Sequence, residues 1–369
     1  MEYAIYIVLG FILAVILGQR ILSGILVISL CKHLFDIPDS RKVHHYPISR
    51  LGGISFLPVI VLVMCGMNIL EFYLESDSGM LPNISEVFEA MCLTIGLILL
   101  FLIGVYDDLM GVSYRQKFIM QIIASAFIPL SGLFIHHFYG LFSILEIPVW
   151  IGISLTMFFT VFVTNAINLI DGIDGLASGL SMEVLLFLGI SFALNGVWMY
   201  SLFSFVCLGV LVPFFFYNVF GDVNRGRKLF MGDTGSLTLG FILSILSIKY
   251  IISTKQNLLM AVDEAPFVII ISLLFVPCLD MCRVVLERLV RKVNPFKPDK
   301  SHIHHLFLRM GYTQRRSFVL ILLFSFFFIV LTFVLIHLGV ASELVLFFDL
   351  SLWILANVWF RHMIKNNNV

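Results

Sequence analysis

Residues 317–338 read SFVLILLFSFFFIVLTFVLIHL and contain no Asp, Glu, Lys or Arg. An α-helix needs about 20 mainly apolar residues to cross a bilayer, so this stretch predicts a transmembrane helix. The whole chain has the same character: 60% of its 369 residues are hydrophobic, 12% are charged, and the mean hydropathy is +1.03. This composition excludes a soluble fold and indicates an integral membrane protein.

Similar apolar runs recur along the whole length, whereas the alternating pattern of a transmembrane β-barrel strand is absent. We therefore expect an all-α, polytopic membrane protein in which residues 1–369 form one integral-membrane domain. We predict about eleven spans, at residues 4–30, 51–70, 88–105, 117–136, 148–167, 177–195, 198–217, 235–252, 266–286, 317–338 and 343–360.

Lys and Arg predict the orientation, because cytoplasmic loops retain them. All of the 23 basic residues except Arg20, Lys249 and Lys255 fall in alternate connecting segments or at the carboxyl terminus. These segments are 31–50, 106–117, 218–234, 283–316 and 361–369. We expect the amino terminus outside and the carboxyl terminus in the cytoplasm. The net charge of zero hides this asymmetry.

Five aspartates lie in three short polar segments of this apolar chain: Asp107, Asp108, Asp171, Asp174 and Asp233. Carboxylates beside membrane spans are costly and mark functional chemistry by default. In the predicted topology all five lie at cytoplasmic ends of spans. Converging carboxylates suit Mg²⁺, with Mn²⁺ as an alternative, and a metal in turn suits a nucleotide diphosphate.

Residues 165–175, NAINLIDGIDG, place Asn165, Asn168, Asp171 and Asp174 three residues apart, so successive members are neighbours on a helix. Gly172 and the glycine after Asp174 loosen that helix and let backbone approach a ligand. The alternative is a polar helix end with glycine caps.

Residues 231–236, MGDTGS, precede a predicted span, so their amides and hydroxyls lie near a helix N-terminus that attracts anions. A simple N-cap is the alternative. The Asp107–Asp108 pair could share a cation or be a solvated turn after a helix. Arg115 and Lys117 follow it closely and could face phosphate.

Residues 301–311, SHIHHLFLRMG, bring three histidines together in the last large cytoplasmic segment. Their spacing is not the metalloprotease spacing, so imidazoles that hydrogen-bond a pyrophosphate or sugar are favoured over zinc ligands. A basic patch that touches anionic lipid is the alternative. The first cytoplasmic loop adds Arg41, Lys42, His44, His45 and Arg50, which could hold a lipid phosphate or serve only as positive-inside charge.

Together these segments resemble the polyprenyl-phosphate N-acetylhexosamine-1-phosphate transferase superfamily. The matching stretches are 36–53, 104–117, 165–179, 218, 230–240 and 301–311. The stretch 301–311 is most similar to the branch that primes O-antigen, common-antigen and teichoic acid linkage synthesis. The branch that transfers phospho-MurNAc-pentapeptide typically has a His-His-His-Phe-Glu version, which is missing here.

The resemblance implies transfer of an N-acetylhexosamine-1-phosphate, most often GlcNAc-1-phosphate, from its UDP-sugar to undecaprenyl phosphate, with Mg²⁺ and release of UMP. The lipid-linked product would initiate cell-surface polysaccharide synthesis, including lipopolysaccharide O-antigen. The resemblance also implies a bacterial inner membrane location, with catalytic cytoplasmic loops that form the active site on that face. The partners are then the two substrates and the bilayer, with no nucleic acid. The sequence leaves open whether the protein forms a homodimer.

By similarity, Asp233 is the favoured metal ligand, and Asp107 and Asp108 act on the lipid phosphate or the metal. Asn168 and Asp171 would contact pyrophosphate or Mg²⁺. Asp174 and Phe230 would address the uridine, and His304 the diphosphate or sugar. Further substrate-binding positions implied by the resemblance are Lys42, Arg115, Lys117, Asn218, His302 and His305. Many relatives carry a Lys soon after the Asp-Asp pair, where this chain has Gly111 and then Arg115.

The chemistry favours direct single displacement. A phosphomonoester is largely dianionic near neutral pH, with a second pKa of about 6, so it scarcely needs a strong base. Asp107 would at most assist as a general base. The rival mechanism is a two-step route through an aspartyl-phosphate intermediate. A phospho-MurNAc-pentapeptide transferase is the alternative enzyme. An ion-coupled transporter is the alternative of another class, and it would need acids at mid-span depth.

Overall fold

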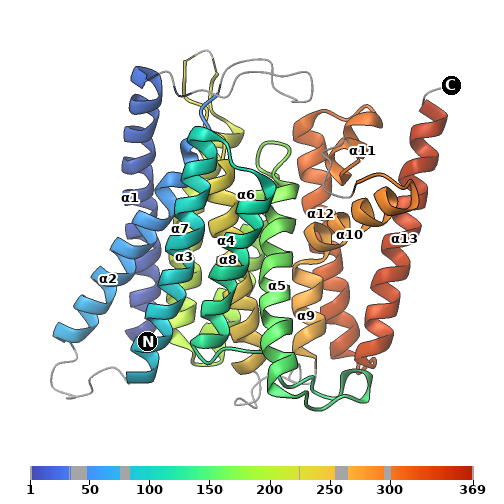
Figure 1. Ribbon diagram of the computed structural model, residues 1–369, viewed down its shortest axis with the longest axis horizontal. Coiled ribbons are helices and arrows are strands. Elements are labelled where there is room, and N and C mark those ends of the chain that lie inside the picture. Colours follow the sequence, from blue (N-terminus) through green and yellow to red (C-terminus); the bar gives the residue numbers. More distant parts are fainter. Residues whose placement is uncertain are drawn as a thin grey trace.

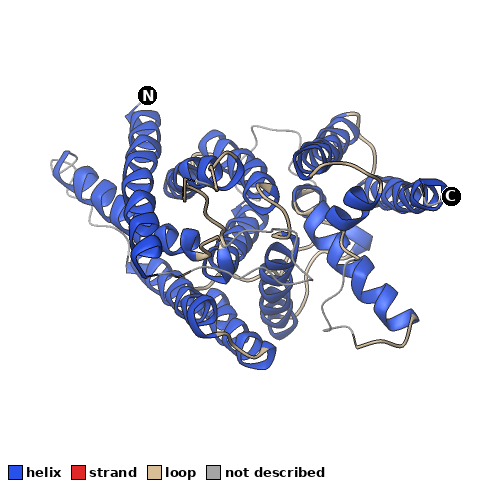
Figure 2. Ribbon diagram, turned by 90° about the horizontal axis from the view of Figure 1, so that it is seen from above, coloured by secondary structure: helices blue, strands red, loops and turns tan. Residues whose placement is uncertain are grey.

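The computed structural model describes residues 2–32, 34, 48–74, 84–223, 225–253, 265–294 and 301–367. Within these ranges the protein is helical, and no strand is formed (Figure 2). The only pairings of β type there are isolated bridges, Ser49 with Leu229 and His137 with Glu146. The predicted all-α class is confirmed.

The helices follow the predicted apolar runs. They are α1 (Glu2–Lys32), η1 (Leu51–Ser55), α2 (Phe56–Leu74), α3 (Ile84–Met110), α4 (Tyr114–Leu130), η3 (Leu141–Ser143), α5 (Val149–Ile170), α6 (Leu176–Leu194), α7 (Trp198–Val219), α8 (Gly232–Ser253), α9 (Pro266–Leu273), α10 (Phe275–Val290), α11 (Ile303–Arg309), α12 (Gln314–His337) and α13 (Ser342–Asn367). Most stand side by side in one bundle, with the two termini at opposite ends (Figure 1).

The predicted count of eleven spans is not confirmed. Among the described residues nine helices are long and apolar enough to cross a membrane, or ten if α9 and α10 form one bent span. Helix α4 has 17 residues and is not among the nine. It nevertheless stands within the bundle, beside α3 and α5 (Figure 1).

The predicted span at 266–286 is broken. Helices α9 and α10 meet at Leu274 with a bend of 73°. Pro277 explains the break: it has no N–H to give to the carbonyl of Leu273, and its ring clashes with that carbonyl in a continuous helix. In the first turn of α10 the same proline is tolerated. Helix α10 therefore leaves the bundle axis and runs across it.

Helix α8 forms the centre of the bundle. In the most apolar 18-residue stretch of α8, 89% of the residues are buried, against 22% in the corresponding stretch of α1. Helix α8 packs against α3, α5 and α6. Close approach of α3 requires a glycine, since a Cβ on Gly104 would lie 2.4 Å from the Cα of Thr234. This contact sets the carboxyl end of α3 directly beside the amino end of α8.

Chain direction gathers the aspartate segments at one end of the bundle. Helices α3, α5 and α7 end there, and α4, α6 and α8 begin there (Figure 1). Lys249, an exception to the predicted charge distribution, lies at the opposite end of α8. Its Nζ pairs with Glu89 Oε1 of α3 at 3.0 Å and lies 4.4 Å from the centre of the Tyr200 ring. An ion pair between helices thus accounts for its position.

Candidate active site

A polar cluster joins four helices at the end of the bundle where the aspartates gather. Lys117 on α4 holds its Nζ 2.6 Å from Asp107 Oδ2 on α3 and 2.9 Å from Asp233 Oδ1 on α8. Asn168 on α5 donates from Nδ2 to the same Asp233 oxygen at 2.6 Å. We call Asp107, Lys117, Asn168 and Asp233 the polar cluster. It brings three widely separated sequence motifs into contact.

Helix ends explain how the polar cluster forms. Ser113 caps α4 with a complete capping box, which begins the helix one turn before Lys117. Asp107 Oδ1 accepts from the Val112 amide at 2.6 Å, so the α3–α4 turn folds back onto its own carboxylate. Asn168 also donates to Ser236 Oγ at 2.8 Å, which connects α5 with the first turn of α8.

Asp108 has a different role from Asp107. Its Oδ1 accepts from the Asp233 amide at 2.8 Å, and its Oδ2 accepts from the Thr234 amide at 2.9 Å and from Thr234 Oγ1 at 2.6 Å. A carboxylate from α3 thus caps the N-terminus of α8, where the helix dipole favours negative charge. Both oxygens are used in positioning Asp233.

Asp108→Asn is expected to lower the stability of the folded protein by about 1 kcal/mol, since the amide offers one acceptor oxygen and no charge to three donors. Thermal unfolding in detergent measures this loss as a lower melting temperature. Asp222→Asn, in the exposed segment before α8, serves as the control. Equal melting temperatures for the two variants would show that Asp108 does not cap α8.

Asp171 follows α5 as its C-cap, outside the spanning segments. Burial, then the nearby charges of Asp233, Asp174 and Asp108, raise the pKa of Asp171 to about 7, and Arg50 opposes this rise. The cause is a surplus of carboxylates in a confined volume. A bound cation would relieve this repulsion and favour the ionised form.

Asp174 and Asn218 are held by the segment between α7 and α8. Lys228 Nζ pairs with Asp174 Oδ2 at 2.5 Å. Asn218 accepts from the Gly175 amide at 2.6 Å and donates to the Leu229 carbonyl at 2.8 Å. The Asp174 turn is therefore fixed from both sides.

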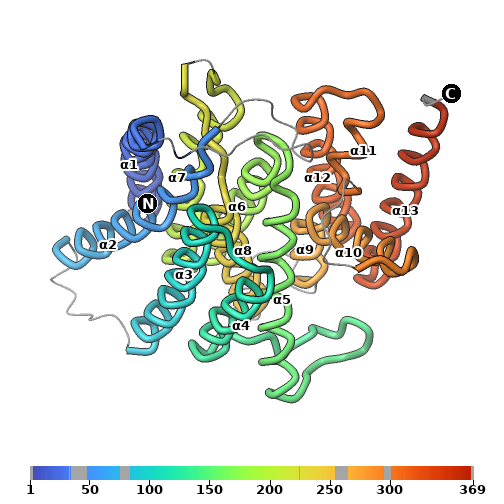
Figure 3. Tube along the Cα trace, turned by 45° about the horizontal axis from the view of Figure 1, so that its top comes forward, coloured from blue at the N-terminus to red at the C-terminus, as the bar shows by residue number. Residues whose placement is uncertain are grey.

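Phe230 lies in the same segment, and its backbone pairs with the residues before η1. Its amide donates to the Ser49 carbonyl at 2.8 Å, and its carbonyl accepts from the Gly52 amide at 3.0 Å. Residues 49–53 and 229–231 thus run together at the end of the bundle, where the two chain segments meet (Figure 3). This contact joins the end of the stretch 36–53 to the start of the stretch 230–240.

The histidine segment packs against the turn after α5. A Cβ on Gly172 would lie 2.2 Å from His304 Nε2, so the imidazole ring rests directly on the backbone of that turn. Burial, followed by the charge of His305, lowers the pKa of His304 to about 3, so this imidazole is neutral. Its Nδ1 has no hydrogen-bond partner among the described residues. The His304 ring centre lies 4.3 Å from that of His305 and 6.0 Å from that of His302.

Arg115, a predicted substrate-binding residue, does not reach the polar cluster. Arg115 is exposed, and its Nε donates to the neighbouring Tyr114 hydroxyl at 3.1 Å. Lys42 lies outside the described residues, as do Arg41, His44 and His45. Of the two basic residues that follow the Asp107–Asp108 pair, Lys117 is the one that reaches the carboxylates.

Two residues at the site were missed in the sequence. Lys228 was counted only as one of the charges between α7 and α8, and its contact with Asp174 is not visible from spacing. Asp280 belongs to none of the sequence motifs, yet its Oδ2 lies 2.8 Å from His302 Nδ1. A buried acid at the end of an apolar run was the available signal.

The fold and the site define a class: a multi-pass membrane protein with a carboxylate and lysine centre at one end of its helices. Residues 90–251 match the family described as Glycosyl transferase family 4. A probable undecaprenyl-phosphate N-acetylglucosaminyl 1-phosphate transferase of Bacillus subtilis (strain 168) is 32% identical over 89% of this chain and 84% of its own length.

Two further relatives carry the name undecaprenyl-phosphate alpha-N-acetylglucosaminyl 1-phosphate transferase. The Yersinia pestis protein is 29% identical over 90% of this chain and 84% of its own length. The Escherichia coli (strain K12) protein is 30% identical over 79% and 73%. The chain belongs to the polyprenyl-phosphate N-acetylhexosamine-1-phosphate transferase superfamily, which confirms the resemblance seen in its motifs.

Proposed function

We propose that the protein transfers GlcNAc-1-phosphate from UDP-GlcNAc to undecaprenyl phosphate, releasing UMP. The observation that carries this proposal is the polar cluster, in which Lys117 pairs with two carboxylates and Asn168 binds one of them, so that four helices meet. The names of the relatives support the same lipid acceptor and sugar phosphate. They do not favour a phospho-MurNAc-pentapeptide transferase.

The transporter alternative is also not favoured. It requires acids at mid-span depth. The clustered aspartates lie instead at helix ends, on the last turn of α3 and the first turn of α8. Asp349, which is inside α13, accepts from Thr332 of α12 at 2.8 Å and so links two neighbouring helices.

We propose Mg²⁺ as the cofactor, with Asp233 and Asp171 as the residues that would hold it. The donor set fits a hard cation: in the polar cluster two carboxylates already share one positive charge, that of Lys117. Asp108 is a weaker candidate because both its oxygens cap α8. Among the described residues no three acidic, His or Cys side chains form a ready-made metal site, so substrate oxygens would complete the coordination. When bound, the ion would neutralise charge on the diphosphate.

The protein's own residues would then bind and orient two anions. Lys117 is placed to offer its ammonium to phosphate oxygens, and the neutral His304 can hydrogen-bond the diphosphate without adding charge. An oxygen of undecaprenyl phosphate forms a bond to the β-phosphorus, and the bond from that phosphorus to the UMP oxygen breaks. A dianionic phosphate needs no strong base for this displacement.

We place this centre on the cytoplasmic face of the bacterial inner membrane. Lys117 and Lys228 pair with the aspartates, and helix α11 and the carboxyl end of α13, which carry Arg309 and Arg361, lie toward the same end of the bundle (Figure 1), as expected for a cytoplasmic face. Release of a polyprenyl tail from the bilayer would cost about 0.8 kcal/mol per CH₂ group, so the lipid must be met at the membrane surface. UDP-GlcNAc would arrive from the cytoplasm.

Purified protein should release UMP only when undecaprenyl phosphate, UDP-GlcNAc and Mg²⁺ are all supplied. Removing the metal with EDTA should abolish release, and added Mg²⁺ should restore it, because metal neutralisation supplies several kcal/mol at such sites. UDP-MurNAc-pentapeptide should be inactive as a donor. Full activity in EDTA would refute the proposal that Mg²⁺ is the cofactor. A phosphorylated enzyme trapped with UDP-GlcNAc alone would refute direct displacement.

A further inference from the structure

Asp280 on α10 is a buried carboxylate whose two oxygens are both committed to the histidine segment. It is 1% exposed. Its Oδ2 lies 2.8 Å from His302 Nδ1, and its Oδ1 accepts from the Ile303 amide at 2.9 Å. It therefore holds both the first histidine and the first residue of α11.

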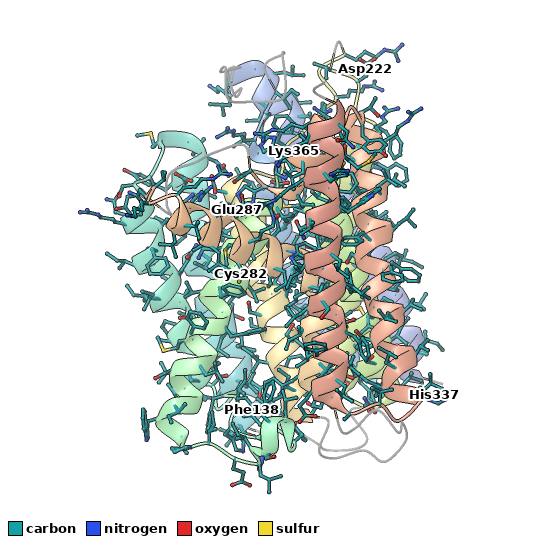
Figure 4. All side chains as sticks on the ribbon, turned by 90° about the vertical axis from the view of Figure 1, so that its right-hand side faces the viewer. Phe138, Asp222, Cys282, Glu287, His337 and Lys365 are labelled. Carbon is teal, nitrogen blue, oxygen red and sulfur yellow. The ribbon has the colours of Figure 1, made fainter. Side chains whose placement is uncertain are left out.

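Arg283, one turn further along α10, fixes the start of the same segment. Its Nη2 donates to Asp280 Oδ1 and to the Ser301 carbonyl, each at 2.6 Å. Its Nη1 donates to Glu287 at 2.7 Å, and Glu287 pairs with Arg361 of α13. In Figure 4 the part of α10 that carries Glu287 lies beside α13. The bent helix α10 thus connects the histidine segment to the last helix of the bundle.

The orientation fixed at His302 extends to His304. The two rings are parallel to within 2° with centres 6.0 Å apart, and His304 lies on the Gly172 backbone. His304 is 2% exposed, so the ring has little room to turn. A carboxylate that accepts from one ring nitrogen also fixes which nitrogen of that imidazole is left for other partners.

We propose that Asp280 is a positioning residue for the transfer reaction, acting through the histidine segment. It holds residues 301–303 so that His304 lies on the turn between Asp171 and Asp174. This inference rests on the proposed function for its effect on turnover, whereas its structural part does not depend on that function.

The structural part is tested by chemical labelling of histidines with diethyl pyrocarbonate, followed by mass spectrometry. Asp280→Ala should increase labelling of His304 severalfold, because the segment that buries this ring is released. Asp280→Asn, which keeps the volume and one acceptor oxygen, should give a smaller increase. Labelling of His136, in the turn between α4 and α5 at the opposite end of the bundle, should not change. If either folded variant keeps His304 as unreactive as the wild type, the proposal is wrong.

The functional part is tested by a double-mutant cycle on UMP release. Asp280→Ala should lower kcat by about 30-fold, since small displacements of a positioned group have effects of this order. In His304→Ala the further change Asp280→Ala should add almost nothing, because the two residues act in one chain of contacts. If the double variant instead shows the product of the two single losses in kcat, the proposal is contradicted.

Asp349→Asn is the matched control, a buried carboxylate on α13 that contacts Thr332 and not the histidines. It should leave kcat and His304 labelling as in the wild type. A wild-type protein that releases no UMP from UDP-GlcNAc would contradict the proposed function. The labelling comparison would still decide whether Asp280 holds the segment.

Discussion

Asp233→Asn is expected to lower kcat/KM for UMP release by about a thousandfold or more. Asp233 Oδ1 receives both the Lys117 ammonium and the Asn168 amide, so one oxygen organises the centre of the polar cluster. Losing its charge removes a proposed metal ligand and leaves Lys117 with Asp107 alone. Metal and electrostatic stabilisation of this kind is worth several kcal/mol, and each 1.4 kcal/mol is about a tenfold change in rate.

Asp222→Asn is the matched control for this experiment. Asp222 precedes α8 in the same connecting segment but is half exposed and pairs with Arg225. It should keep near wild-type activity. Both variants should be expressed and melt like the wild type. If Asp233→Asn keeps more than a tenth of the wild-type kcat/KM, the polar cluster is not the reaction centre.

Gly172→Ala is expected to lower kcat/KM by about a hundredfold, the effect of moving a positioned group by about 1 Å. The new Cβ would lie 2.2 Å from His304 Nε2 and 2.3 Å from its Cε1, which is too close for heavy atoms that are not bonded to each other. The ring must therefore move away from the turn that carries Asp171. Steady-state kinetics of UMP release measure the loss.

Gly66→Ala on α2 is the matched control, since nothing lies within 4 Å of a Cβ built there. It should have no effect. The double variant Gly172→Ala with His304→Ala should be no less active than His304→Ala alone, because the clash disappears with the imidazole. A Gly172→Ala protein with wild-type kcat/KM would mean that the position of His304 is unimportant.

The membrane class and the position of the site could be predicted from the sequence because both depend on periodic or local signals. Apolar runs give the helices, and the three aspartate segments lie at helix ends that the chain direction brings to one end of the bundle. The break at Leu274 is only partly readable. Pro277 lies inside the predicted span, but Pro213 lies inside α7, which continues past it.

The partners of individual side chains could not be predicted, because they depend on distances between helices. Arg115 and Lys117 are two residues apart, and only the rotation of α4 decides that Lys117 faces the carboxylates while Arg115 faces Tyr114. Asp107 and Asp108 are adjacent, yet one pairs with Lys117 and the other caps α8. Likewise, the contact of Asp280 with His302 appears only after α10 bends.

The most direct test of the central claim follows the phosphorus atom that the enzyme is proposed to move. Purified protein is incubated with undecaprenyl phosphate and UDP-GlcNAc that carries radioactive phosphorus in the phosphate next to the sugar. A sugar-1-phosphate transferase must deliver both the label and GlcNAc to the lipid and release unlabelled UMP. If the label is found instead in a water-soluble nucleotide product, whether or not GlcNAc reaches the lipid, the account is contradicted.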